Sequence, residues 1–281
     1  MTLQEQDVQP TASAEFPLPP RMGFAQAIAS YVTKVGAVTE IEVRKMSRDP
    51  SEMLTRAVQP VLWLLIFGQV FTRVRAIPTG GVPYIDYMVG GILAQSILFI
   101  AIFSGMMIIW ERDLGTSHKL IVSPTPRSAI VLGKAFSCGI RTVPQVILIY
   151  ILSTLLHTHL KMDPLSILGV VTTVFLSSTL FSTLSLLIAC LAKFRERFMG
   201  IGQLLTMPLF FASNALYPIA MMPDWLQVLS HVNPLSYSVD ALRWFTIGQS
   251  VFSFTTDWAI LFCISCVLVA VCARIYPRIA A

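Results

Sequence analysis

Residues 84–110, YIDYMVGGILAQSILFIAIFSGMMIIW, decide the fold, because Asp86 is the one charged side chain among them. The stretch is longer than the ~20 residues that an α-helix needs to cross the hydrocarbon core of a bilayer. Lipid solvates so long an apolar run, whereas water does not. The segment therefore predicts a membrane-spanning helix.

The composition of the whole chain agrees with a membrane protein. Of its 281 residues, 55% are hydrophobic and 12% are charged, whereas soluble domains average about 25% charged residues. The formal net charge is +5, but the basic residues flank the apolar runs and form no separate basic patch. This distribution is typical of the positive-inside bias of membrane proteins, and no nucleic-acid partner is expected.

The apolar runs predict an all-α integral membrane protein with about six transmembrane helices and one transmembrane domain over residues 21–281. The polar, proline-rich residues 1–20 are expected to form a disordered cytoplasmic tail. Residues 23–48 alternate apolar and charged positions at helical spacing, which predicts an interfacial amphipathic helix or, alternatively, an amphipathic helix packed on protein. The predicted spans are 57–71, 84–110, 129–156, 165–192, 199–218 and 258–276.

The segment before the last span differs from the others, because prolines and charged residues interrupt it between residues 216 and 257. It is expected to form short amphipathic or re-entrant helices on one face of the membrane. Fifteen of the 20 Lys and Arg residues lie on the opposite side, four lie on the same side as this segment, and Arg141 is unassigned. The asymmetry predicts that both termini are cytoplasmic and the 216–245 segment is extracellular.

Arg127, Lys134 and Arg141 are spaced by seven residues and therefore share one face of the third predicted span. Two interpretations of Arg141 are open: its guanidinium reaches the lipid headgroups, or it pairs with an acidic group at a subunit interface. On the outer side, His157 and His159 lack a third ligand, so no metal site is expected.

The connection from Glu111 to Arg127 follows the second span and is predicted to be cytoplasmic. It combines charged residues, a turn-forming Gly115 and a short apolar ridge at Leu120. A helix there would suit docking into a partner's groove, although a solvated connecting loop fits the residues equally well.

Two groups of motifs resemble the type-2 ATP-binding-cassette (ABC) exporter permeases. The first is Glu-x-x-x-Gly-Thr from Glu111, Leu-x-x-Ser-Pro-x-x-Arg from Leu120, and Gly133-Lys134. The second runs from Asn214-Ala-Leu-Tyr-Pro through Met222-Pro-Asp-Trp-Leu and Asn233-Pro-Leu-Ser-Tyr to Asp240-Ala-Leu-Arg. The resemblance covers residues 23–278, and the daunorubicin-exporter permeases are the most similar branch.

The resemblance implies a bacterial plasma-membrane permease that pairs with a second permease subunit and with separate ABC ATPase subunits. The chain has no Gly-x-x-x-x-Gly-Lys-Ser/Thr loop, so no enzymatic activity of its own is expected, and ATP and Mg²⁺ would act through the partner. In this family the 111–127 connection is the coupling helix that rests on the ATPase. The implied coupling residues are Glu111, Gly115, Thr116, Leu120, Ser123, Pro124 and Arg127.

In the same family the second and fifth spans line a substrate path between the two permease copies. Aromatic and Met side chains on these spans suit varied apolar shapes, although helix packing explains any one of them as well. The candidate residues are Phe99, Phe103, Met106, Gln203, Met207, Phe210, Phe211 and Asn214. The implied extracellular cap contains Tyr217, Pro218, Trp225, Asn233 and Pro234.

The function expected from these observations is ATP-driven export of an amphiphilic drug or lipid-like molecule across the lipid bilayer. Export of a lipid-linked glycan by the same architecture is the first alternative, and it would require a polar or aromatic groove for sugars. A membrane-embedded enzyme or a channel is more remote, because no cluster of acids, bases or metal ligands is apparent at membrane depth.

Overall fold

The computed structural model describes residues 24–46, 50–74, 77–114, 125–192 and 194–276. Within these ranges the chain is helical and contains no strand. Four helices are long and apolar enough to cross a membrane: α4 (Tyr84–Asp113), α6 (Arg127–Leu155), α7 (Pro164–Leu191) and α11 (Phe254–Ile275). They correspond to the second, third, fourth and sixth predicted spans, so the expectation of an all-α multi-pass membrane protein is confirmed.

The first predicted span begins earlier than expected. Helix α2 (Pro50–Leu62) continues through a π-helical turn, η1 (Trp63–Gly68), into α3 (Gln69–Val74). Pro60 lies inside α2, and a proline removes one backbone hydrogen bond of a helix. The wider turn follows directly after it, and π-helical turns inside α-helices are often found at functional sites.

The fifth predicted span ends earlier than expected, because α8 (Arg195–Phe211) does not reach Pro218. The N–H of Ala212 still donates to the carbonyl of Pro208 at 2.9 Å, and the chain then turns away. Pro218, which adopts an extended conformation, could not have continued the helix. The apolar run therefore overestimated the helix by including this turn.

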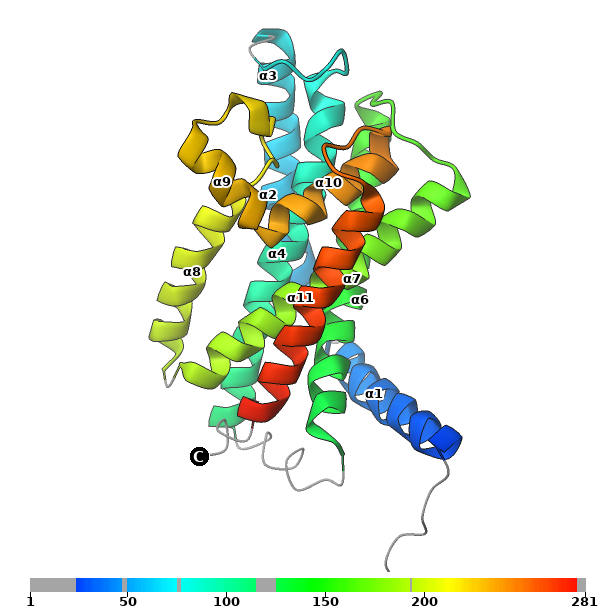
Figure 1. Cartoon of the computed structure of the whole chain (residues 1–281), viewed down its shortest axis with the longest axis vertical. Helices are drawn as coiled ribbons and strands as arrows, with labels where there is room; N and C mark the ends of the chain where they lie inside the picture. The colour runs from blue at the N-terminus through cyan, green and yellow to red at the C-terminus, as the bar shows by residue number, and fades with distance from the viewer. Residues whose placement is uncertain (1–23, 47–49, 75–76, 115–124, 193, 277–281) are drawn as a thin grey trace, which may run out of the picture.

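The elements are arranged as an elongated bundle (Figure 1). Helix α1 (Phe24–Met46) lies obliquely at one end of the bundle, which we call the α1 end, beside the start of α6. Helix α3 and the start of α4 mark the opposite, α3 end. Helix α11 finishes at the α1 end, so the first and last described helices approach the same side.

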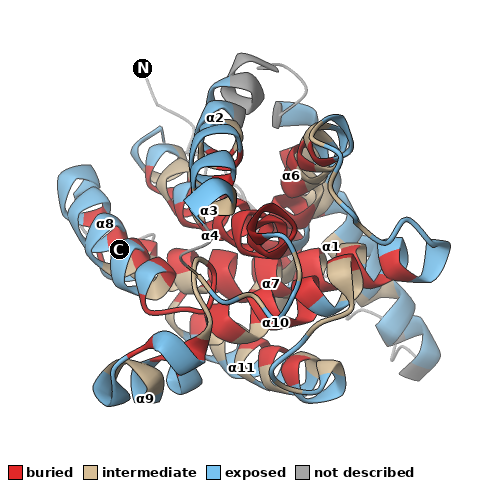
Figure 2. Cartoon of the chain, turned by 90° about the horizontal axis from the view of Figure 1, so that it is seen from above, coloured by how far each residue is buried: buried red, intermediate tan, exposed pale blue. Residues whose placement is uncertain are grey.

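Helix α4 forms the centre of the bundle and packs against α6, α7, α8 and α10 (Figure 2). Its apolar side chains are mostly buried, whereas few of those of α11 are, and Phe262 and Val267 on α11 are 60% and 62% exposed. Large exposed apolar side chains on a spanning helix suit contact with lipid chains or another apolar surface.

Small residues allow the helices to approach closely, as is common in membrane bundles. A Cβ at Gly105 on α4 would lie 2.8 Å from the carbonyl oxygen of Ser185 on α7. A Cβ at Gly91 would meet the backbone of Ala215, which follows α8. These two glycines therefore fix how α4 meets its neighbours.

The segment predicted as a cap over residues 216–245 divides into two parts. Helix η2 (Ile219–Met221) and α9 (Asp224–Val232) lie at the periphery, and Trp225 on α9 is 69% exposed. Helix α10 (Pro234–Ile247) instead packs into the bundle against α4, α7 and α11 (Figure 2). The first part lies on the surface and the second is buried in the bundle, and the extracellular placement of the segment stays a prediction.

Arg243 on α10 is buried inside the bundle, with only 2% of the residue exposed. Its Nη2 donates to the carbonyl oxygen of Asn214 at 2.9 Å, and its guanidinium lies 3.6 Å from the centre of the Tyr87 ring. The carbonyl oxygen and the aromatic face take the place of water around the guanidinium. Arg243 can therefore be buried, and α10 can pack inside the bundle.

Candidate coupling and substrate-path sites

Helix α1 docks on the start of α6 because Gly133 leaves room for it. A Cβ at Gly133 would lie 2.6 Å from Cβ of Val38 and 3.0 Å from the carbonyl oxygen of Val35. The Thr39 hydroxyl donates to the Gly133 carbonyl at 3.1 Å. Gly133 therefore serves the contact with α1, and the next residue, Lys134, lies beside the same helix.

Replacing this glycine tests the docking. Gly133→Ala should destabilise the chain by about 1–3 kcal/mol, because the added methyl group has no space between α1 and α6. Gly36→Ala on α1 is the matched control, since a Cβ there meets nothing within 4 Å. Thermal unfolding of the purified chain in detergent would measure both, and equal midpoints for the two variants would contradict this packing.

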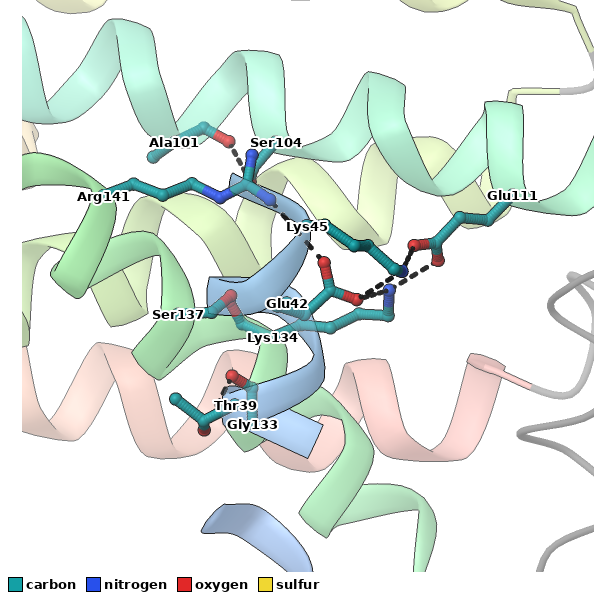
Figure 3. A network of polar contacts seen from close by, with 10 residues as sticks. All are labelled: Thr39, Glu42, Lys45, Ala101, Ser104, Glu111, Gly133, Lys134, Ser137 and Arg141. Atoms are coloured by element: carbon teal, nitrogen blue, oxygen red, sulfur yellow. Dashed lines mark hydrogen bonds and ion pairs between the residues drawn. The ribbon is translucent and has the colours of Figure 1, made fainter. Parts of the chain in front are cut away.

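Lys134 belongs to a network of five charged side chains that joins α1, α4 and α6 (Figure 3). Its Nζ lies 3.0 Å from Oε1 of Glu42 on α1 and 2.6 Å from Oε2 of Glu111 on α4. Lys45 on α1 also contacts both carboxylates, with a distance of 3.2 Å to Glu42. Arg141 on α6 approaches Glu42 at 3.6 Å. Two lysines thus bridge the same two carboxylates, and through them three helices.

Most of this network is removed from solvent. The Glu42 and Lys134 side chains are each 8% exposed, that of Arg141 is 9% exposed and that of Glu111 is 14% exposed, whereas Lys45 is 42% exposed. Burial alone would raise the pKa of Glu42, but Lys134 and Lys45 outweigh it and hold the pKa of this carboxyl below its ordinary value. The Glu42 carboxylate therefore stays ionised at neutral pH.

This direction gives a pH dependence. Because the folded-state pKa of Glu42 is lowered, its contribution to stability is present above its unfolded pKa and is lost as the pH falls through the folded value. The wild-type chain should therefore lose more stability below about pH 4.5 than Glu42→Gln does. Unfolding midpoints between pH 7 and pH 3 would show this as a flatter acid limb for the variant, and parallel limbs would contradict it.

Arg141 pairs with an acidic group, as one of the two interpretations of its position expected. The partner is Glu42 of the same chain. The docking of α1 on α6 brings this carboxylate to the arginine, which the sequence of α6 alone did not indicate.

The predicted coupling residues are only partly described by the structure. Glu111 lies in the network, and Arg127 is the exposed first residue of α6. Gly115, Thr116, Leu120, Ser123 and Pro124 lie outside the described residues. Helix α4 ends at Asp113, whose carboxylate accepts from Nε of Arg195 on α8 at 3.0 Å. The described end of the connection is thus tied by ion pairs to α1, α6 and α8.

A cavity lies between α4 and α8, the two helices that were predicted to line a substrate path. It has a volume of about 70 Å³. Five of the eight predicted residues line it, namely Phe99, Phe103, Met106, Gln203 and Met207. The rest of the lining is largely apolar, and the Gln203 amide and the Thr206 hydroxyl add polar groups.

The other three predicted path residues lie elsewhere. Phe210 is 3% exposed and packs edge-on against Trp63, with ring centres 6.0 Å apart. Phe211 is 45% exposed and does not line the cavity. Asn214 is fully buried below α10, and its backbone carbonyl accepts from Arg243. The cavity therefore includes only the part of the fifth span that faces α4.

The predicted cap residues have structural roles of their own. The Oδ1 of Asn233 accepts from the N–H of Leu235 at 2.9 Å and Pro234 is the first residue of α10, an arrangement typical of a helix N-terminus. The Asn233 amide also donates to the carbonyl of Leu209 on α8 at 2.7 Å. The Tyr217 hydroxyl donates to the carbonyl oxygen of Phe211 at 2.6 Å. Pro218 precedes η2, and the Trp225 side chain is exposed.

Sequence reasoning missed Lys45 and Lys134 as partners of Glu111, and Glu42 as the second carboxylate that both lysines contact. Two signals were present: the seven-residue spacing of basic residues on α6, and acidic residues on an otherwise apolar amphipathic helix. Because the apolar faces of α1 and α6 both need to be buried, a contact between these two helices could have been predicted. The register that places Glu42 opposite Lys134 depends on the close approach at Gly133.

The fold and these sites define a multi-pass, all-helical membrane protein with a charged junction at one end and an apolar cavity along one side. The family model for the ABC-2 type transporter matches residues 33–247. The chain therefore belongs to the ABC-2 type transporter family, and the family expected from the sequence motifs is confirmed.

Several named proteins are similar to the chain over most of their length. The transport permease ycf38 of Cyanophora paradoxa is 29% identical over 217 residues, which cover 76% of this chain and 73% of that protein. The daunorubicin resistance ABC transporter permease protein DrrB1 of Streptomyces coeruleorubidus is 23% identical, covering 82% and 80%. Nodulation protein J of Neorhizobium galegae is 23% identical, covering 72% and 76%.

Proposed function

We propose that the chain is the permease subunit of an ATP-driven exporter that moves amphiphilic drug-like or lipid-like molecules out of the cell. In this proposal the α1 end faces the cytoplasm of a bacterium and both termini lie there. Two permease subunits pair with two ABC ATPase subunits, which bind ATP and Mg²⁺. Membership in the ABC-2 family supports this assembly, and the bias of basic residues supports the orientation.

The observation that carries the proposal is the buried ion network at the α1 end. It connects Glu111, where the connection to the ATPase begins, with α1 and α6. A movement imposed on the 111–127 connection would therefore be transmitted to three helices as one unit. Because α4 also lines the cavity shared with α8, the same movement would alter the substrate path.

At about 70 Å³ the cavity would hold only part of a drug-sized molecule, and its chemistry favours an amphiphile over a glycan. Aromatic and thioether side chains dominate its lining, and few polar groups are available to bind sugar hydroxyls. Met side chains adapt to different apolar shapes. The relative named as a daunorubicin resistance permease supports a substrate of this kind.

Reconstitution tests the transport function directly. The chain is purified from its source membrane with any ATP-hydrolysing subunit that remains bound, and is placed in vesicles with a fluorescent apolar cation. ATP-dependent movement of the dye, abolished by a non-hydrolysable ATP analogue, is the expected result. If the complex moves a lipid-linked oligosaccharide and ignores the dye, the amphiphile assignment is wrong. Dye movement without any ATPase would indicate a channel.

Substitution of one cavity residue tests the path. Met207 lines the cavity, whereas Leu204 on the same helix is 76% exposed and does not. Met207→Ser should weaken apparent dye affinity about tenfold, because it removes apolar surface worth more than about 1.4 kcal/mol. Leu204→Ser should leave transport kinetics unchanged. Equal effects of the two substitutions would remove the cavity from the path.

A further inference from the structure

A second cavity lies between α2, α4 and α6, adjacent to the cavity that α4 forms with α8. Its volume is about 200 Å³. Phe99 and Phe103 on α4 line both cavities and therefore separate them. The volume is below the range of about 300–1,000 Å³ typical of pockets for drug-sized ligands, so a smaller group, such as one lipid headgroup, is the better fit.

Two buried amides in this cavity each have one polar atom without a hydrogen-bond partner among the residues that the structure describes. Gln95 on α4 is 2% exposed and its Oε1 accepts no hydrogen bond, while Gln145 on α6 is 5% exposed and its Nε2 donates none. Both side chains line the cavity. Buried polar groups without partners are costly, so an occupant that both donates and accepts hydrogen bonds would stabilise this site.

A cation and an aromatic ring also line this cavity. The Arg56 guanidinium on α2 lines the cavity and lies 5.3 Å from the centre of the Phe103 ring. Arg56 belongs to the second turn of α2, toward the α1 end, whereas Gln95 lies well inside α4. The positive charge therefore lies toward the boundary of the membrane, and the amides lie deeper.

We propose that this cavity binds an anionic phospholipid whose headgroup carries hydroxyls, the phosphatidylglycerol class, from the leaflet at the α1 end. The phosphate binds near Arg56, because an ionised partner strengthens hydrogen bonds to a guanidinium. The headgroup hydroxyls donate to Gln95 and accept from Gln145. This site does not depend on the proposed transport function, since it requires only the chain and the bilayer.

The test measures lipid retained by the full-length purified chain after delipidation and exchange into nanodiscs. Discs contain either phosphatidylglycerol or phosphatidylcholine diluted in a neutral lipid, and native mass spectrometry counts the lipid bound. Wild-type protein should retain phosphatidylglycerol at least tenfold over phosphatidylcholine. Gln145→Leu should reduce that retention about tenfold, which is the usual effect of losing one hydrogen bond in a charge-assisted site.

Gln227→Leu provides the control, because this glutamine lies on α9 and lines neither cavity. It should retain phosphatidylglycerol as the wild type does. Gln203→Leu is measured beside it, because Gln203 lines the α4–α8 cavity. Gln145→Glu is the second variant: it keeps the size of the side chain but places a negative charge opposite the phosphate, and it should also lose retention. Unfolding midpoints within a few degrees of the wild type show that the variants are folded.

Three results would overturn the proposal. Equal retention of the two lipids would mean that the site does not recognise an anionic headgroup. Loss of lipid in Gln203→Leu but not in folded Gln145→Leu or Gln145→Glu would place the lipid in the other cavity. Full displacement of the lipid by free glycerol 3-phosphate at equal concentration would assign the cavity to a soluble anion.

Discussion

Gly91→Ala is expected to destabilise the fold by about 3 kcal/mol or more, the upper end of the range for overpacking. The added Cβ would lie 2.8 Å from the carbonyl carbon of Ala215 and still closer to the carbonyl oxygen. These are backbone atoms, so no rotamer change can relieve the clash. Either α4 or the turn after α8 would have to move.

Such a movement would disturb several buried contacts together. The carbonyl of Asn214, next to Ala215, accepts from the Arg243 guanidinium, which in turn covers the Tyr87 ring. Displacing the turn would leave the buried Arg243 without this acceptor, and an uncompensated buried charge is strongly destabilising. The effect of one methyl group is therefore expected to spread to α10.

Gly200→Ala is the control for this prediction. Gly200 lies on α8, and a Cβ there meets nothing within 4 Å. Since Ala favours helix over Gly by about 1 kcal/mol, this variant should be as stable as the wild type or slightly more so. The readouts are the unfolding midpoint and the yield of monodisperse protein. A Gly91→Ala chain with a wild-type midpoint would show that α4 and the turn are not in close contact.

The spans could be predicted from the sequence wherever the helix is both long and apolar. The second, third, fourth and sixth spans were predicted because such long apolar runs need lipid, and not water, around them. The end of the fifth span was placed too late, because Ala212, Ala215 and Leu216 in the turn after Phe211 are still apolar, although Ser213 and Asn214 lie between them. Hydropathy indicates whether a segment lies in lipid or in water, but it does not show where the backbone turns.

The path and the network show a second limit. The resemblance indicated that α4 and α8 line a path, and five predicted residues line a common cavity. It did not show which face of α8 meets α4, so Phe210 and Asn214 were included although both are buried elsewhere. Likewise, Glu42 and Lys134 are 92 positions apart. Their pairing depends on tertiary packing that no local pattern encodes.

Lys134→Met should destabilise the chain by about 3 kcal/mol, because it leaves two carboxylates in a mostly buried site without their shared cation. Removing one member of a buried ion pair typically costs about 3–5 kcal/mol. The lower value applies here, since Lys45 still contacts both Glu42 and Glu111. The substitution keeps the length of the side chain, so lost packing contributes little. Thermal unfolding in detergent measures the difference.

The exposed pair Glu40–Arg44 supplies the control. Its side chains are 62% and 75% exposed, so Glu40→Gln should change stability by less than about 1 kcal/mol. In a double-mutant cycle, Glu42→Gln combined with Lys134→Met should cost less than the sum of the two single changes, because each removes the charge that the other leaves unpaired. Strict additivity would show that the network does not act as a unit.

The same variants separate stability from coupling. The comparison is made at a temperature where Lys134→Met remains folded. In this variant α1, α4 and α6 lack the lysine that connects them, so a movement of the 111–127 connection should displace α6 less. Stimulation of the partner ATPase by a transported amphiphile should then fall about tenfold while basal hydrolysis and complex assembly persist. Retained stimulation in a folded Lys134→Met complex would leave the network with a purely structural role, and the route of energy transfer would have to bypass α6.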